Sequence, residues 1–129
     1  MKSEGGGMPR KILVVDDETE IVSLLEEELK ALGYDVLTAL DGLTGLEMAR
    51  KERPALMILD LMLPKMDGYR VCGLLKNDLR YAEIPIILFS ARAQEEDLRL
   101  GVELGANAYI TKPFEPQELL KKVHELVNP

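Results

Sequence analysis

The sequence has a single cysteine, a single histidine and no long apolar run, and these absences exclude several classes of protein. Cys72 cannot form a disulfide within the chain, and its apolar-patterned surroundings, YRVCGLL, favour a buried, reduced thiol. No apolar stretch approaches the roughly 20 residues of a membrane-spanning helix, and the N-terminus lacks the apolar core of a signal peptide. We therefore expect a cytoplasmic protein that has no membrane partner.

Positive charge is also scarce, because 16 Lys and Arg residues stand against 23 Asp and Glu residues, for a net charge of −7. Such an excess of negative charge repels phosphate backbones and anionic lipids. We expect no nucleic-acid contact by this chain alone.

The length of 129 residues and the hydrophobic content of 47 % suit one domain with a single core region. Three glycines precede Met8, so residues 1–9 are interpreted as a flexible leader and residues 10–129 as the domain. The chain ends almost where its last predicted helix ends, so we expect no attached output module.

Five short apolar runs alternate with five segments of helical period, which is the pattern of β-α-β crossover units. The pattern predicts an α/β fold whose parallel sheet is covered by helices on both faces. The predicted strands are 11–15, 34–39, 55–59, 84–89 and 108–111. The predicted helices are 21–32, closed by Gly33, then about 43–51, 69–77, 94–104 and 116–127.

In an open parallel sheet, functional groups collect where the strands end at their carboxyl edge. Chemistry-bearing side chains follow four of the five predicted strands: Asp16 and Asp17, then Asp60, then Ser90, then Thr111, Lys112 and Pro113. The sequence therefore predicts three carboxylates, a hydroxyl and an ammonium at one edge of the sheet.

Each of the three acids has a structural alternative to a role in a site. Asp17 with Glu20 has the spacing of a capping box, although capping a helix and binding a ligand are compatible. Asp16 directly follows ILVV, where a carboxylate is costly to desolvate without a cation or a donor. Asp60 lies between ALMIL and LML, so a purely structural role would bury an acid among aliphatic side chains.

Crowded carboxylates stay ionised most easily around a hard divalent cation, and Mg²⁺ (or Mn²⁺) suits oxygen ligands. Zinc is disfavoured, because it would need Cys and His ligands that Cys72 and His124 cannot supply, and His124 is expected at the surface beside two lysines. Lys112 can neutralise a phosphoryl oxygen and Ser90 can donate to another, while Asp60 is the natural nucleophile. These residues predict phosphoryl transfer.

Four motifs, ILVVDDE, LMILDLMLPKMDG, IPIILFSA and GANAYITKPF, resemble in order and spacing the receiver domain of two-component response regulators. The resemblance covers about Lys11 to Val127. It implies a doubly wound, five-stranded parallel sheet of order 2-1-3-4-5 in a flavodoxin-like three-layer α/β/α sandwich, as in the chemotaxis response regulator.

The resemblance also implies a role for each site residue. Asp60 matches the phosphoacceptor, Asp17 a direct ligand of Mg²⁺, and Asp16 the acid that holds the ion through water. Asp60 and the backbone carbonyl of Met62 would complete the protein ligands. Lys112 matches the lysine that pairs with the phosphoryl group.

Further positions match the switch and the turns of the family. Ser90 and Tyr109 match the hydroxyl and aromatic switch residues, and Pro113 matches a Lys-Pro bond that is usually cis. Pro64 and Gly68 would shape the turn LPKMDG, with Asp67 capping the following helix.

Some features depart from the DNA-binding branch of the family. That branch has paired acids where this chain has Asn107-Ala108, so dimerisation through the fourth helix, fifth strand and fifth helix is not expected. The segment KNDLRYAEIPII is more similar to receivers found alone, in hybrid kinases or before signalling enzymes. Met62 and Arg92 occupy positions that tune the lifetime of the acyl phosphate.

The resemblance implies a switch that takes a phosphoryl group from a sensor histidine kinase or phosphotransfer protein and changes its affinity for an unknown output protein. The alternative is a Mg²⁺-dependent phosphohydrolase that turns over an external substrate through an aspartyl-phosphate. Against it, the acids have the wrong spacing, and neither a cap insertion nor a general base is evident. Dinucleotide binding is disfavoured, because DDETE stands where a glycine-rich phosphate loop belongs.

Overall fold

The structure is a computed structural model that describes residues 9–92 and 94–128. The predicted flexible leader therefore lies, except for Pro9, outside the described residues. No helix among the described residues is long and apolar enough to cross a membrane.

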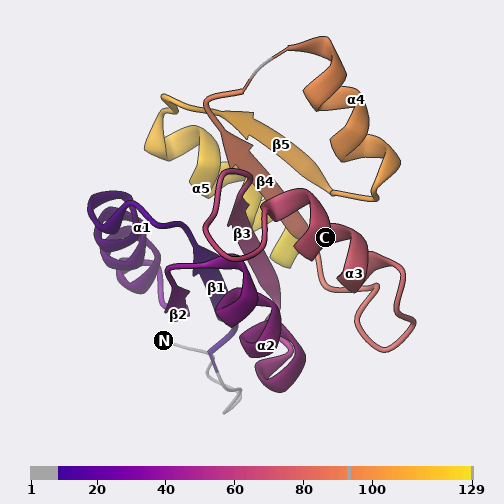
Figure 1. Ribbon diagram of the computed structural model, residues 1–129. Helices are drawn as coiled ribbons and strands as arrows, with labels where there is room; N and C mark the ends of the chain where they lie inside the picture. The colour runs from indigo at the N-terminus through magenta and orange to yellow at the C-terminus, as the bar shows by residue number, and fades with distance from the viewer. Residues whose placement is uncertain (1–8, 93, 129) are drawn as a thin grey trace.

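Within the described ranges, five parallel strands form one sheet of order β2-β1-β3-β4-β5, with helices on both of its faces (Figure 1). The strands are β1 Lys11–Val15, β2 Asp35–Ala39, β3 Leu56–Asp60, β4 Ile86–Ser90 and β5 Ala108–Thr111. The helices are α1 Thr19–Ala31, α2 Gly42–Glu52, α3 Gly68–Lys76, α4 Glu95–Glu103 and α5 Pro116–Val127. The predicted fold class and strand order are confirmed.

The central strands are buried along their whole length and send alternate side chains into two cores. Met57 and Leu59 of β3 pack into the core beneath α2 and α3, whereas Leu56 and Ile58 pack into the core beneath α1 and α5. β4 is divided in the same way. This two-sided burial explains why both strands are apolar up to their last residue.

Two small differences in strand bounds matter for the site. The sequence places the ends of the third and fourth strands at Leu59 and Phe89, but β3 continues through Asp60 and β4 through Ser90. Asp60 pairs with Phe89 in register, and Ser90 pairs with Thr111. Both polar residues are therefore held by the sheet itself and not by a loop.

The ends of the first and third helices differ in how they are capped. Of the two alternatives left open for Asp17, the capping box with Glu20 is not formed, because Glu18 is the N-cap residue of α1 and makes no side-chain cap hydrogen bond. Instead, Asp16 Oδ1 accepts from the backbone N–H of Glu18 at 2.8 Å, so the turn into α1 is closed by the buried acid. Asp67 caps α3 as predicted and accepts from Arg70 N at 2.9 Å.

The lone cysteine and histidine lie where the sequence predicts. Cys72 is fully buried against the sheet, and burial raises the pKa of its thiol to about 11. His124 is exposed on α5. The thiol is therefore a neutral part of the core at physiological pH.

Gly68 lies where the loop after β3 returns to the strand end. Its N–H donates to Leu61 O at 2.9 Å, and an added Cβ would lie 2.3 Å from Asp60 O and 2.8 Å from Leu61 Cα. Pro64 lies in the same loop. Its backbone oxygen accepts hydrogen bonds from Met66 N and from Gly42 N at the start of α2. The loop can approach the end of β3 only because residue 68 has no side chain.

We expect Gly68→Ala to lower the free energy of unfolding by about 2 kcal/mol or more, because two backbone segments would have to separate. Gly73→Ala is the matched control. Its Cβ would meet only Leu104 Cδ2 at 3.5 Å, so replacing a helical glycine should raise stability by up to about 1 kcal/mol. Urea denaturation of both variants tests this, and equal effects would contradict the steric argument.

Candidate functional site

Three carboxylates meet at the carboxyl edge of the sheet. Asp16 follows β1 and is fully buried, Asp17 is exposed beside it, and Asp60 ends β3 with 3 % of its surface exposed. Each residue offers a carboxylate oxygen, and these oxygens all lie within 4.8 Å of one another. The sequence thus correctly predicts that these acids converge.

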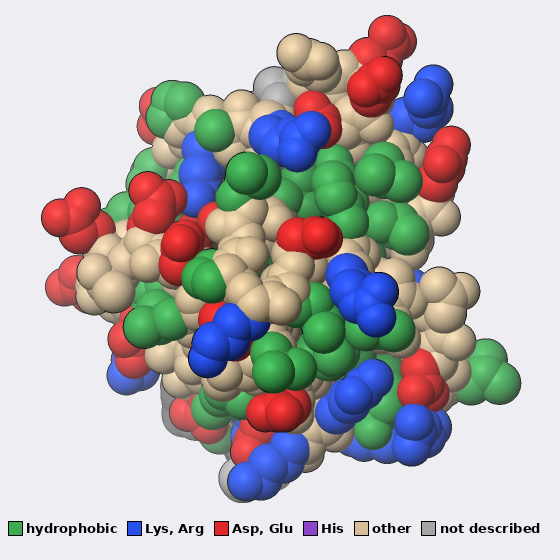
Figure 2. All heavy atoms as spheres, in the orientation of Figure 1, with side chains coloured by type: hydrophobic (Ala, Val, Ile, Leu, Met, Phe, Trp, Pro, Cys, Tyr) green, Lys and Arg blue, Asp and Glu red, His purple; other side chains and the backbone are tan. Residues whose placement is uncertain are grey.

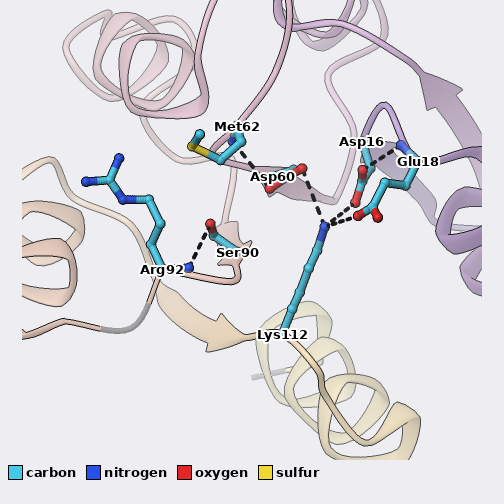
Figure 3. A network of polar contacts seen from close by, with 7 residues as sticks. All are labelled: Asp16, Glu18, Asp60, Met62, Ser90, Arg92 and Lys112. Atoms are coloured by element: carbon cyan, nitrogen blue, oxygen red, sulfur yellow. Dashed lines mark hydrogen bonds and ion pairs between the residues drawn. The ribbon is translucent and has the colours of Figure 1, made fainter.

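Lys112, which follows β5, reaches into this cluster (Figure 3). Its Nζ lies 3.0 Å from Asp16 Oδ2, 2.8 Å from Glu18 Oε1 and 3.5 Å from Asp60 Oδ2. The ammonium also lies 4.7 Å from the centre of the Phe89 ring, within cation–π distance. The bond between Lys112 and Pro113 is cis, as the resemblance implied.

The charges in this cluster are unbalanced. Burial and the neighbouring Asp16 raise the pKa of Asp60 to about 6, against the opposing effect of Lys112. Burial alone would lower the pKa of Lys112, but its hydrogen bonds to Glu18 and Asp16 raise it overall. The cluster thus holds four carboxylates, three of which contact the ammonium of Lys112.

This donor set suits a metal ion. Clustered carboxylate oxygens with excess negative charge are the ligands that hard divalent cations prefer. A cation would offset the repulsion that raises the pKa of Asp60.

Ser90 ends β4 and is fully buried close to Asp60. Its Oγ accepts from Arg92 N at 3.2 Å, while Asp60 Oδ1 accepts from Met62 N at 3.3 Å. In Figure 3, Asp60 lies between Lys112 on one side and Met62 and Ser90 on the other. Polar groups at or just after the ends of β3, β4 and β5 therefore surround one carboxylate.

Tyr109 does not enter this site in the structure. Its hydroxyl donates to Arg92 O at 2.7 Å, and burial raises its pKa to about 12. Because the N–H of the same Arg92 donates to Ser90 Oγ, the two predicted switch residues are connected through one residue of the β4–α4 loop.

A pocket opens above the carboxylates. Its apolar wall comes from α1, the loop after β3 and the loop after β5: Ile21, Leu24, Met62, Pro113 and Phe114. Asp17, Asp60, Ser90 and Lys112 line the same pocket, so Asp60 can be reached from solvent. The Met62 side chain stands at its edge, where 59 % of the residue is exposed.

Sequence reasoning missed the part played by Glu18. Its carboxylate makes the shortest of the three ion pairs to Lys112, although more than half of the side chain is exposed. The acidic run DDE contained the signal, but only the folded chain shows which of its three acids face Lys112.

A family model described as the response regulator receiver domain matches residues 12–124. This chain belongs to that family. The alkaline phosphatase synthesis transcriptional regulatory protein PhoP of Bacillus subtilis is 48 % identical to the chain over 121 residues. That alignment covers 94 % of this chain and 50 % of PhoP, and the chain spans about half the length of the curated relatives it matches.

Solved receiver structures agree with the fold. A putative response regulator from Chloroflexus aurantiacus has a TM-score of 0.88 at 34 % identity, covering 95 % of this chain and 100 % of that one. The BeF3-activated DrrB receiver domain has a TM-score of 0.86 at 35 % identity, with the same coverage of both chains. The predicted family is confirmed.

A receiver domain is a phosphoacceptor switch of two-component signal transduction, and this receiver domain has the acidic cluster typical of such a site. The segment KNDLRYAEIPII before β4 led to the expectation of a receiver found alone, in a hybrid kinase or before a signalling enzyme. PhoP, by contrast, is a transcriptional regulatory protein. That expectation therefore stays a prediction.

The raised pKa of Asp60 gives a testable dependence of stability on pH. A carboxyl whose pKa rises from 3.8 to about 6 on folding binds its proton more tightly in the folded state. The free energy of unfolding should therefore fall as the pH rises from about 4 to about 6 and stay low above that range. Asp60→Asn should remove this penalty and raise stability at pH 8 by about 2 kcal/mol in EDTA, with a smaller gain near pH 4.

Urea denaturation at several pH values measures this effect. Asp35→Asn, which removes an exposed carboxylate from β2, is the control of equal charge change and should show no comparable gain. An Asp60→Asn protein that is no more stable than the parent at pH 8 would contradict the electrostatic account.

Proposed function

We propose that this receiver domain accepts a phosphoryl group on Asp60 from a phosphohistidine of a sensor histidine kinase or phosphotransfer protein. The observation that carries the proposal is the position of Asp60, a buried carboxylate at the end of β3 that faces both an ammonium and two further acids. Residues 10–129 would act as the single receiver domain, in the cytoplasm.

In the transfer step, an Asp60 oxygen attacks the phosphorus atom while the bond from phosphorus to the histidine nitrogen breaks. The nitrogen keeps the electron pair of that bond, and an acyl phosphate forms on Asp60. With a pKa of about 6, Asp60 is mostly ionised at neutral pH and can act as the nucleophile.

Asp17, Asp60 and the backbone carbonyl of Met62 would hold Mg²⁺, or Mn²⁺ in its place, with Asp16 acting through water. The ion would supply positive charge to these acids and to the phosphoryl oxygens. The closeness of the three carboxylates supports this assignment.

Lys112 would give up some of its present ion pairs and would pair with a phosphoryl oxygen. Its Nζ already lies 3.5 Å from Asp60 Oδ2, so only a short movement is needed. Ser90 would donate its hydroxyl to another phosphoryl oxygen. Pro64, Gly68 and Pro113 would hold the surrounding turns in place.

The signal would leave the site through the β4–α4 loop. If Ser90 turns toward a phosphoryl group, the hydrogen bond from Arg92 N to its Oγ changes, and Arg92 O also holds the Tyr109 hydroxyl. Movement of these groups would change the free energy with which the domain binds an output protein by a few kcal/mol at most. With its net charge of −7, the domain itself would make no nucleic-acid contact.

Acetyl phosphate and Mg²⁺ should give one acid-stable, base-labile phosphoryl adduct per chain, because an acyl phosphate hydrolyses readily in base. Intact-mass measurement should show that Asp60→Ala abolishes the adduct, whereas Asp35→Ala keeps it. Turnover of many equivalents of a phosphoester by the parent protein would instead favour the phosphohydrolase alternative.

Met62→Asn should speed loss of the phosphoryl group by about tenfold or more, because an amide could position the attacking water that the apolar Met62 side chain does not. The decay of the purified phosphorylated protein measures the rate. Met62→Leu, which keeps the position apolar, should decay like the parent. An asparagine variant that hydrolyses no faster would count against this role.

A further inference from the structure

A second concave surface lies between α3 and α4, away from the carboxylates. Its lining is mainly apolar: Tyr69, Gly73, Leu74, Leu79, Leu100 and Leu104, which are referred to below as the α3–α4 groove. Leu79 is 97 % exposed and Leu100 is 39 % exposed. Figure 2 shows hydrophobic side chains gathered between these two helices, with Lys and Arg side chains beside them. So much exposed leucine in one hollow is typical of a binding surface.

Charged side chains line the rim of the α3–α4 groove: the basic Arg50 and Arg70 and the acidic Asp67 and Asp78. Neither Arg50 nor Arg70 forms an ion pair with any residue in the described part of the chain. Asp78 pairs with Arg80 at 2.8 Å, and Asp67 accepts from the backbone N–H of Arg70, so three arginines stand against two acids around the groove. Two arginines are thus left to face a ligand.

We propose that the α3–α4 groove docks an amphipathic helix of another protein, with its apolar stripe on the leucines and acidic residues facing Arg50 and Arg70. The shape and the charge both select this occupant. A hollow between two helices with an apolar floor fits the side chains of one helical face. The arginines on its rim favour acidic residues beside that face and disfavour basic ones.

The groove is also connected to the site. The Tyr69 hydroxyl lies 3.3 Å from both the backbone oxygen and Oδ1 of Asp97 at the start of α4. Asp97 is buried, and its Oδ1 lies 3.1 Å from Arg92 Nε. The N–H of Arg92 donates to Ser90 Oγ, so a change at Ser90 would alter contacts that set the spacing of α3 and α4. This coupling rests on the proposed function, whereas docking itself does not.

The test of docking uses a synthetic helical peptide of about 15 residues with a leucine stripe flanked by glutamates. Two control peptides have the same composition in scrambled order, or lysines in place of the glutamates. Titration into ¹⁵N-labelled protein without Mg²⁺ should shift the amide signals of Gly73, Leu79, Leu100 and Leu104. The control peptides should bind at least about tenfold more weakly.

Two variants and their matched controls test the contacts. Arg70→Glu should weaken binding by about tenfold, whereas Lys122→Glu, the same charge change on α5, should not. Leu79→Ser should also weaken it by about tenfold, whereas Leu32→Ser, another exposed leucine, should not. Because Arg70, Leu79, Lys122 and Leu32 are all exposed or half-buried, the variants are expected to fold.

Several outcomes would overturn docking. One is that the signal changes are confined to the pocket above Asp60. Another is that the scrambled peptide binds equally well. A third is that both control variants, Lys122→Glu and Leu32→Ser, lose binding. Dimerisation of the protein alone through Leu79 and Arg70 would assign the groove to a second copy and would also overturn it.

A second titration, with beryllofluoride and Mg²⁺, tests the coupling. Peptide affinity should change by about threefold or more when the signal of Ser90 shows that beryllofluoride is bound, and Asp60→Asn should abolish the change. Unchanged affinity with beryllofluoride bound overturns the coupling but leaves docking intact. No binding of beryllofluoride at all would refute the proposed function, while the metal-free titration would still decide docking.

Discussion

The central constraint on this molecule is the concentration of negative charge at one edge of the sheet. The ammonium of Lys112 neutralises part of that charge. Three carboxylates contact this lysine, and two of them belong to residues that are almost completely buried. Burial and mutual repulsion leave Asp60 with a pKa of about 6, so the folded protein holds this acid at a cost. Such a cost is expected where a structure keeps a site ready for a cation and an anionic group.

The rest of the fold keeps these charges in place. β3 and β4 are buried on both faces, and their alternate side chains are fixed in two cores, so the backbone at Asp60 and Ser90 is held in place. The loop after β3 is held against the strand by Gly68, which tolerates no side chain at its position. Rigid strand ends and close loops together place polar groups within hydrogen-bond distance of one another.

Polar contacts also extend from the site to the surface through the β4–α4 loop. Arg92 contacts Ser90 through its N–H, Tyr109 through its carbonyl and Asp97 through its guanidinium. One residue thus joins the end of β4 to β5 and α4, and Asp97 extends the chain of contacts to Tyr69 on α3. A local change beside Asp60 therefore has a physical route to two faces of the domain.

The sequence by itself determined the alternation of strands and helices along the chain, the burial of Cys72 and the position of three acids at the carboxyl edge. These follow from apolar periodicity and from the ends of apolar runs. It could not decide between capping and ligation for Asp17, and it missed Glu18 as a partner of Lys112. The contact between Glu18 and Lys112 joins residues 94 positions apart in the chain, and no local pattern encodes it. Only the tertiary structure decided that Asp16 closes the turn into α1, that β3 includes Asp60, and that Arg92 joins Ser90 to Tyr109. The first is a local turn that the sequence pattern leaves open. The other two are contacts between β3 and β4 and between the β4–α4 loop and β5, and their geometry exists only once the sheet has formed.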